Sequence, residues 1–127
     1  MYRLELDGHK IAHKGDVGNP LPDDQIAFFE GVDVLLALAG GYLTIELPDL
    51  MKMIHRVQPR LVVPMHFRTL TYRPRNTHWI EAFLAHFRDE AVDFACAHTT
   101  AITRETLPEA TRVLVMDYLR APASGAA

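Results

Sequence analysis

Cysteine is nearly absent from this chain, which has a single one, Cys96, in 127 residues. One cysteine excludes an intrachain disulfide and any zinc cage built from several thiolates. Long apolar runs are absent too, since the longest, residues 34–39, is far too short to span a bilayer. No apolar leader-like stretch follows Met1, so we expect a cytoplasmic protein without a membrane segment.

Clusters of basic residues are also missing. The chain has 13 Lys and Arg against 16 Asp and Glu, a formal net charge of −3. Because nucleic-acid binders gather Lys and Arg on one face, we expect no nucleic-acid partner. The length suits one domain, which we expect to span residues 1–120. The small-residue stretch 121–127 is expected to be a disordered tail.

What is present begins with a hairpin signal. Apolar and polar residues alternate over residues 2–6 and again over 9–13, and Asp7-Gly8 separates the two runs. Asp-Gly tolerates the positive φ angles of a tight hairpin turn, so these residues predict two antiparallel strands. After a Gly- and Pro-rich loop, Asp23 or Asp24 is expected to cap a short helix that reaches Phe29.

The centre of the chain alternates between apolar runs and helical periodicity. Residues 32–39 and 60–65 read as buried strands, apolar on both faces. Between them, apolar residues recur at helical spacing from Leu47 to Ile54, and Pro59 lies just beyond. A second helix is expected around residues 80–87, capped by Asn76 or Thr77, followed by strands at 92–97 and 112–119. This alternation predicts an α/β fold.

Two polar residues follow strands that are expected to be neighbours. Asp16 comes after the strand that ends at His13, and His66 comes after the strand that ends near Pro64. In α/β folds, ligands bind beside the carboxyl ends of the strands. Carboxylate oxygen and imidazole nitrogen are ordinary ligands of zinc, manganese or iron. The same residues would equally suit a Gly-Asp turn and an ordinary loop histidine, so spacing alone leaves both readings open.

The segments IAHKGDVGNPL and VDVLLALAGGYLTIELPDLMKMIHRVQPRLVVPMHFRT resemble the C-terminal half of a metallo-β-lactamase-fold metal-dependent hydrolase. They look most similar to the bacterial branch described as ascorbate-6-phosphate-lactonase-like. The resemblance covers about residues 2–70. It implies half of an αββα sandwich, with a mixed β-sheet and helices on one face.

The resemblance also implies roles for individual residues. Asp16 falls on the aspartate that bridges two metals, and His66 falls on the last histidine, a ligand of the second metal. His13 is expected to support the site without binding the metal. Gly40 and Gly41 would let the backbone pass close to it. The metal implied is Zn or Mn. Four histidines later in the chain are expected to be structural or solvated (His55, His78, His86 and His98).

The cluster His-x-His-x-Asp-His of this family is not in the sequence. Two ligands cannot fill a zinc shell. We therefore expect a hydrolase that is incomplete alone and needs a partner, either a second copy in a face-to-face homodimer or a missing N-terminal half. Two alternatives remain open. The chain could be a non-catalytic homodimeric relic, or an anion-binding module that uses the loop 68–76 with Arg68, Tyr72, Arg73 and Arg75.

Overall fold

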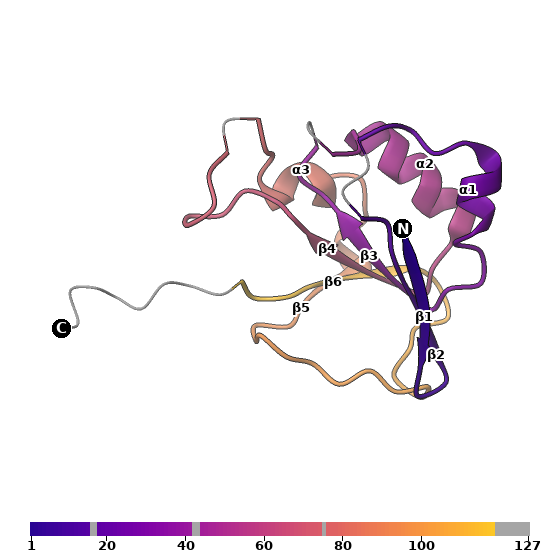
Figure 1. The fold of residues 1–127 in the computed structure, drawn as a ribbon. Helices are drawn as coiled ribbons and strands as arrows, with labels where there is room; N and C mark the ends of the chain where they lie inside the picture. The colour runs from indigo at the N-terminus through magenta and orange to yellow at the C-terminus, as the bar shows by residue number, and fades with distance from the viewer. Residues whose placement is uncertain (16–17, 42–43, 75, 119–127) are drawn as a thin grey trace.

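The computed structural model describes residues 1–15, 18–41, 44–74 and 76–118 (Figure 1). Six strands form one sheet in the order β1-β2-β3-β4-β6-β5. β1 pairs antiparallel with β2, and every other pairing in the sheet is parallel. The strands are β1 Tyr2–Leu6, β2 His9–His13, β3 Val34–Leu38, β4 Leu61–Met65, β5 Val92–Phe94 and β6 Arg112–Val115. The sheet is mixed, as the sequence predicts.

The first two strands form the expected hairpin. Asp7 and Gly8 have φ angles of 51° and 76°, so both residues of the turn lie in the left-handed region. A two-residue turn of this kind matches the right-handed twist of the strands on either side. Tyr2 consequently pairs with His13, and Leu6 with His9.

Three α-helices and one 3-10 helix connect the later strands: α1 Asp23–Ala27, α2 Leu47–Val57, α3 Ile80–Leu84 and η1 Asp89–Ala91. α2 matches its prediction and ends at Val57, and the C-cap residue Gln58 adopts φ 47°. The predicted caps are wrong. Pro22 and Trp79 occupy the N-cap positions of α1 and α3, and neither makes a side-chain capping hydrogen bond. Asp23 instead accepts a hydrogen bond from Arg56 of α2 at 2.6 Å.

The α-helices cover one face of the sheet (Figure 1). Alternate residues of the central strands point toward them, because side chains in a strand alternate between its two faces. Leu35 of β3, Val62 of β4 and Val113 of β6 are fully buried there, as are Phe29 and Phe83. This main core fixes the strands whose carboxyl ends carry the candidate site.

The chain itself covers the middle of the opposite face, which half of an αββα sandwich would leave exposed. Leu107 is buried with Val34 and Leu61, and Ile102 packs against the same cluster. Both belong to the segment of residues 95–111, which runs along this side of the sheet (Figure 1). Toward the β1 edge the cover is missing: Tyr2, Leu4 and Leu6 are 67%, 49% and 59% exposed.

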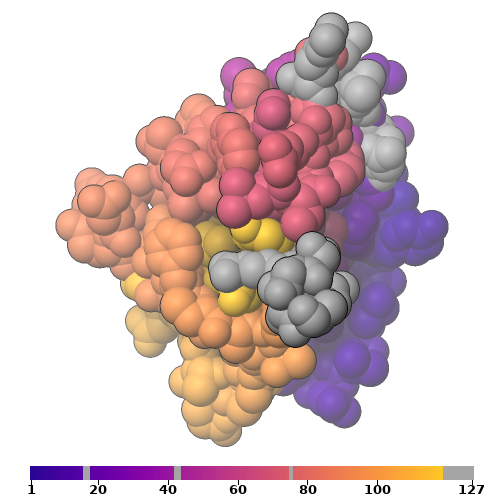
Figure 2. All heavy atoms as spheres, turned by 90° about the vertical axis from the view of Figure 1, so that its left-hand side faces the viewer, coloured from indigo at the N-terminus to yellow at the C-terminus, as the bar shows by residue number. Residues whose placement is uncertain are grey.

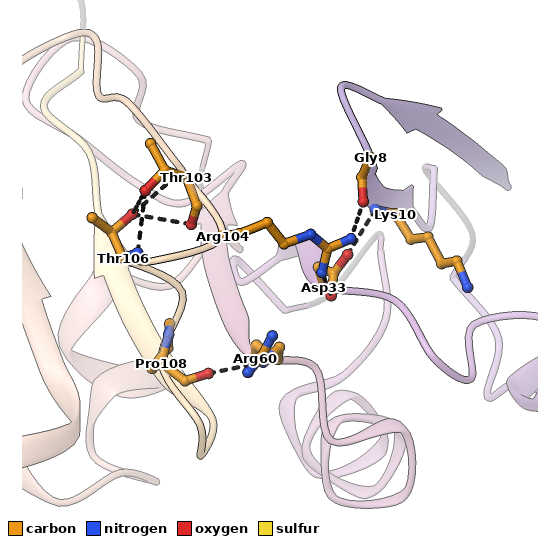
Figure 3. Close-up of polar contacts among 8 residues, drawn as sticks. All are labelled: Gly8, Lys10, Asp33, Arg60, Thr103, Arg104, Thr106 and Pro108. Carbon is orange, nitrogen blue, oxygen red and sulfur yellow. Dashed lines mark hydrogen bonds and ion pairs between the residues drawn. The ribbon is translucent and has the colours of Figure 1, made fainter.

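A buried carboxylate holds part of this covering segment to the hairpin turn (Figure 3). Asp33 is 8% exposed, and its Oδ2 accepts a hydrogen bond from the Lys10 N–H at 2.8 Å. Its Oδ1 lies 3.5 Å from Nη1 of Arg104. The other terminal nitrogen of Arg104, Nη2, donates to the Gly8 carbonyl. Four residues farther along, the carbonyl of Pro108 accepts a hydrogen bond from Arg60 at 3.0 Å.

Within the described ranges, no helix is long and apolar enough to cross a membrane. Residues 121–127, for which the sequence predicts a disordered tail, lie outside the described residues.

Candidate functional site

The candidate site lies where β2, β3 and β4 end. His13 is the last residue of β2, Gly40 and Gly41 follow β3, and His66 follows β4. Because these strands are parallel neighbours, their carboxyl ends meet at one edge of the sheet. Asp16, the other predicted metal ligand, lies outside the described residues.

His13 makes two contacts through its ring nitrogens. Its Nδ1 accepts a hydrogen bond from the Gly15 N–H at 2.7 Å, and its Nε2 lies 3.1 Å from the sulfur of Met65. An Nδ1 that accepts a hydrogen bond places the proton of the neutral ring on Nε2. His13 thus links the end of β2 to the end of β4. The supporting role that the sequence analysis gives His13 stays a prediction.

His66 directly follows β4 and has a φ angle of 54°. Its side chain is exposed. Its Nε2 lies 2.8 Å from the hydroxyl oxygen of Tyr72, and the two ring centroids are 5.5 Å apart. The loop that carries both residues extends from the end of β4 (Figure 1). The Tyr72 hydroxyl is therefore the hydrogen-bond partner of one ring nitrogen of His66, the predicted metal ligand.

Gly40 touches the backbone of His66. A Cβ atom at Gly40 would lie 2.2 Å from the His66 carbonyl oxygen and 2.7 Å from Cγ2 of Thr77. The Gly40 carbonyl accepts a hydrogen bond from the His78 N–H at 2.8 Å. Gly41 has φ 77°, and a Cβ there would lie 2.4 Å from the His78 ring. The two glycines allow the loop after β4 to lie directly against the end of β3.

The described residues do not supply a complete metal shell. None of them forms a group of three or more His, Cys, Asp or Glu side chains that could hold a metal ion. A structural zinc site needs four protein donors and a catalytic site needs three. His66 alone, paired with Tyr72, does not fit a bound metal.

The loop 68–76, the predicted anion-binding region, has side chains that are already engaged. The guanidinium of Arg68 lies 5.4 Å from the centre of the Trp79 ring, over its face. Nε of Arg73 donates to the Leu70 carbonyl at 2.6 Å. Arg75 lies outside the described residues. These contacts engage only part of each described guanidinium, and the anion-binding alternative stays a prediction.

Four other histidines are predicted to be structural or solvated, and the side chains of all four are exposed (His55, His78, His86 and His98). His78 comes nearest to the site, since its ring lies against Gly41 and its backbone bonds to Gly40 and to Arg68. The residue that sequence reasoning missed is Tyr72 as the partner of His66. The sequence indicates Tyr72 only as part of the predicted anion-binding loop, because a spacing of six residues within a loop carries no periodic signal.

The fold and the strand-end residues define an α/β domain whose candidate site lies at the carboxyl edge of a mixed sheet. The chain belongs to the family described as the beta-lactamase superfamily domain, whose model matches residues 1–66. This confirms the superfamily predicted from the sequence, and the chain's homologues are metal-dependent hydrolases by name.

Relatives among known proteins agree with this family. A UPF0173 metal-dependent hydrolase of Carboxydothermus hydrogenoformans is 32% identical over 68 residues, which are 54% of this chain and 30% of that protein. The corresponding protein of Thermococcus onnurineus is 36% identical over 70 residues, 54% of this chain and 31% of that protein. The chain thus spans under a third of the length of these curated relatives.

A solved structure from Thermotoga maritima has the same fold. Its TM-score is 0.78 at 26% identity, and the likeness covers 90% of this chain and 56% of that one. That protein is described as a candidate Zn-dependent hydrolase of the metallo-beta-lactamase superfamily. The likeness confirms the predicted fold class, a mixed α/β sheet of the metallo-β-lactamase type.

Proposed function

We propose that the chain forms one half of a metal-dependent hydrolase site, with Asp16 and His66 as its metal ligands and zinc or manganese as the metal. The observation that carries the proposal is the placement of His66. The residue leaves β4 beside the end of β3, and Gly40 holds its backbone there. The names of the chain's relatives support a metal-dependent hydrolase.

The chain's own contribution is to hold ligands in place. His66 would offer one imidazole nitrogen, and His13 would keep the end of β2, and with it the segment leading to Asp16, beside β4. A bound metal would supply Lewis-acid activation of water and of the bond to be hydrolysed. Because two ligands do not complete a shell, the remaining donors come from another polypeptide region.

The other polypeptide region would dock on the sheet face opposite the α-helices, at its uncovered β1 edge. The exposed side chains of Tyr2, Leu4 and Leu6 form this docking surface. These three side chains lie on the same face as Ile11, because Leu4 pairs directly with Ile11. The occupant we propose corresponds to the part of the Thermotoga protein that has no counterpart in this chain, since the likeness covers 56% of it. A second copy of the chain is the competing occupant.

The substrate class follows the branch of the superfamily that the sequence resembles. The pattern His13-x-Gly15-Asp16-x-Gly18 and the strand end Pro64-Met65-His66-Phe67 support a lactonase-like branch. We therefore propose a lactone, an amide or a phosphoester as the bond that the completed enzyme hydrolyses. The alternative of a non-catalytic relic is an outcome of the first experiment below.

Metal binding is tested by calorimetric titration of the purified chain with ZnCl₂ and with MnCl₂. We expect weak binding of one of these ions that is lost in Asp16→Asn and in His66→Ala. His98→Ala is the matched control, because His98 is also exposed but lies in the segment that follows β5. Absence of binding by the wild-type chain, or equal binding by all four proteins, would favour the relic.

The docking surface is tested by sedimentation velocity over a range of protein concentrations. If a second copy occupies the exposed apolar edge, the wild-type chain should self-associate and Leu4→Glu should weaken this association. Leu70→Glu is the control, because Leu70 is 62% exposed but belongs to the loop after β4. A chain that stays monomeric at high concentration would remove the second copy as the occupant. If the chain also fails to bind the separately purified N-terminal half of a relative, the docking proposal fails.

A further inference from the structure

β1 is an edge strand of the sheet, and its outer side is unpaired. Within the described part of the chain, β2 is the strand that pairs with it, and the strand order ends at β1. All five residues of β1 are exposed. Figure 2 shows the N-terminal residues, in indigo, along the right-hand margin of the molecule. A free strand edge of this kind is a template for pairing with another strand.

The register of the hairpin determines which main-chain groups of β1 point outward. In a hairpin with a two-residue turn, the residues that flank the turn exchange hydrogen bonds, and hydrogen-bonded and non-hydrogen-bonded pairs then alternate. Leu6 flanks the turn, so Leu6, Leu4 and Tyr2 direct their N–H and C=O groups toward β2. Arg3 and Glu5 direct theirs toward the free edge. Among the described residues, no main-chain hydrogen bond from outside the hairpin reaches either of them.

A second copy of β1 matches these outward groups in an antiparallel register centred on Leu4. Leu4 then lies opposite Leu4 of the second copy, and Arg3 of each copy forms a hydrogen-bonded pair with Glu5 of the other. Registers that set Arg3 against Arg3, or Glu5 against Glu5, also align the outward groups, but they place like charges directly opposite each other, which is destabilising. The sequence Tyr-Arg-Leu-Glu-Leu is therefore complementary to itself.

The charged side chains of β1 lie on the helix side of the sheet and are available for this pairing. Nη1 of Arg3 donates to the carbonyl of Phe28, just after α1, at 2.9 Å. Glu5 lies on the same side, because side chains two residues apart in a strand share a face. Lys10 is opposite Glu5 in the hairpin register, but this pair is not among the ion pairs of the described residues.

The apolar side chains of β1 lie on the other side of the sheet. Tyr2, Leu4 and Leu6 are 67%, 49% and 59% exposed. In the register centred on Leu4, Tyr2 of each copy lies opposite Leu6 of the other. The apolar side chains of the two copies therefore meet along the whole strand, and cross-strand pairs of this kind stabilise a sheet.

The edge strand at the other end of the sheet, β5, is less suited to pairing. It has three residues, Val92–Phe94, and Asp93 in its middle is already bound by Arg112 at 2.9 Å. Short length and charged side chains are among the devices that protect edge strands in natural proteins. β1 is longer, contains no proline, and carries charges of opposite sign that attract a second, antiparallel copy.

We propose that the chain dimerises through β1, as a two-fold symmetric antiparallel strand pair centred on Leu4 that joins two sheets edge to edge. The pairing lies in the plane of the sheet, so it differs from cover of the sheet face and does not depend on a metal. A strand pair of this length is a small interface, so the dimer is weak, with a Kd of about 1 μM to 1 mM.

Charge reversal on β1, followed by sedimentation velocity, tests the register. Arg3→Glu and Glu5→Arg each place like charges opposite each other in the homodimer, so each should weaken self-association about tenfold or more. An equimolar mixture of the two variants should recover the association of the wild type, because each strand then meets a strand of opposite charge. The double variant, which keeps the net charge, should also associate like the wild type.

Glu81→Arg is the matched control for charge reversal. Glu81 is also an exposed glutamate, but it belongs to α3, away from β1 (Figure 1). The same chemical change there should leave the self-association unchanged.

Amide hydrogen exchange of the wild type, measured by NMR at low and high protein concentration, tests the edge directly. Exchange at Arg3 and Glu5 should slow as the concentration rises, because the N–H groups of both residues become hydrogen-bonded in the dimer. Exchange at Leu4 should change little, because its N–H already faces β2. This measurement needs no variant, so it remains decisive if a substitution prevents folding.

The outcomes separate this dimer from other modes of association. A wild-type chain that stays monomeric at the highest concentration overturns the proposal. Association that resists both charge reversals, or that leaves exchange at Arg3 and Glu5 unchanged, also overturns it, because the copies would then meet through another surface, such as the sheet face. If both single variants are folded by circular dichroism and their mixture fails to associate, the register centred on Leu4 is wrong.

Discussion

Replacing Gly40 by alanine adds one methyl group at the closest backbone approach in the candidate site. The added Cβ would lie 2.2 Å from the His66 carbonyl oxygen and 2.7 Å from Cγ2 of Thr77, far inside the ordinary contact range of 3.4–4 Å. Rotation of a side chain cannot relieve the shorter contact, because the carbonyl belongs to the main chain. The end of β3 and the exit of β4 must therefore separate.

The expected loss of stability follows from this steric conflict alone. Gly40 is not among the glycines with a positive φ, so alanine meets no conformational strain there. Overfilling a packed site costs about 1–3 kcal/mol, and a backbone conflict belongs at the upper end of that range. With a urea m-value of about 2 kcal/mol per molar, the unfolding midpoint should fall by about 1 M.

The assay is urea unfolding followed by circular dichroism, and Gly31→Ala is the control. Gly31 has φ 77° and nothing within 4 Å of a built Cβ, so alanine there meets backbone strain and no clash. Only Gly40→Ala should also move the proton resonance of the His66 imidazole, because only Gly40 touches that residue. The reasoning would be refuted by a Gly40→Ala protein with wild-type stability and an unchanged His66 resonance.

Two further predictions concern the charged contacts outside the site. Asp33→Ala leaves the Lys10 N–H without its acceptor and removes the carboxylate that pairs with Arg104, so it should cost about 1–3 kcal/mol in urea unfolding. It should also speed proteolysis within residues 95–111, and unchanged cleavage would contradict the role of Asp33 in holding this segment. The hydrogen bonds and charge of Arg112 hold the pKa of Asp93 below its ordinary value of 3.8. The stability that this pair contributes is therefore present above pH 3.8 and is lost as the pH falls through the lowered pKa, so thermal unfolding of the wild type and of Asp93→Asn should converge in strong acid. A stability difference that persists there would refute this assignment.

Elements with a local signal could be predicted from the sequence. The hairpin depends on Asp7-Gly8 and on the alternation around it, and its strands have the predicted bounds. α2 depends on apolar residues at helical spacing between Pro48 and Pro59, and all of its predicted core residues are buried. The strands β3 and β4 were predicted from apolar runs, which only a sheet buried on both faces explains.

Features that depend on distant contacts could not be predicted. The segment 95–111 has little regular structure, and hydrogen bonds to distant parts of the chain hold it, such as those from Arg104 to the Gly8 carbonyl and from Arg60 to the Pro108 carbonyl. Its covering role therefore leaves no pattern in the sequence. Lys14, which directly follows His13 and is fully buried, is equally unexpected, because lysine is among the residue types least often found fully buried.

The candidate site illustrates the same division. Its position follows from strand order, since His13, Gly40 and His66 each follow one of three neighbouring parallel strands. The pairing of His66 with Tyr72 depends instead on the path of the loop after β4, which the Thr69 turn and the contact between His78 and Gly40 determine. The two kinds of contact differ in what the sequence can reveal. A glycine after an apolar strand marks a close backbone approach, such as that of Gly40 to His66, whereas a side-chain hydrogen bond within an irregular loop depends on the folded path of that loop.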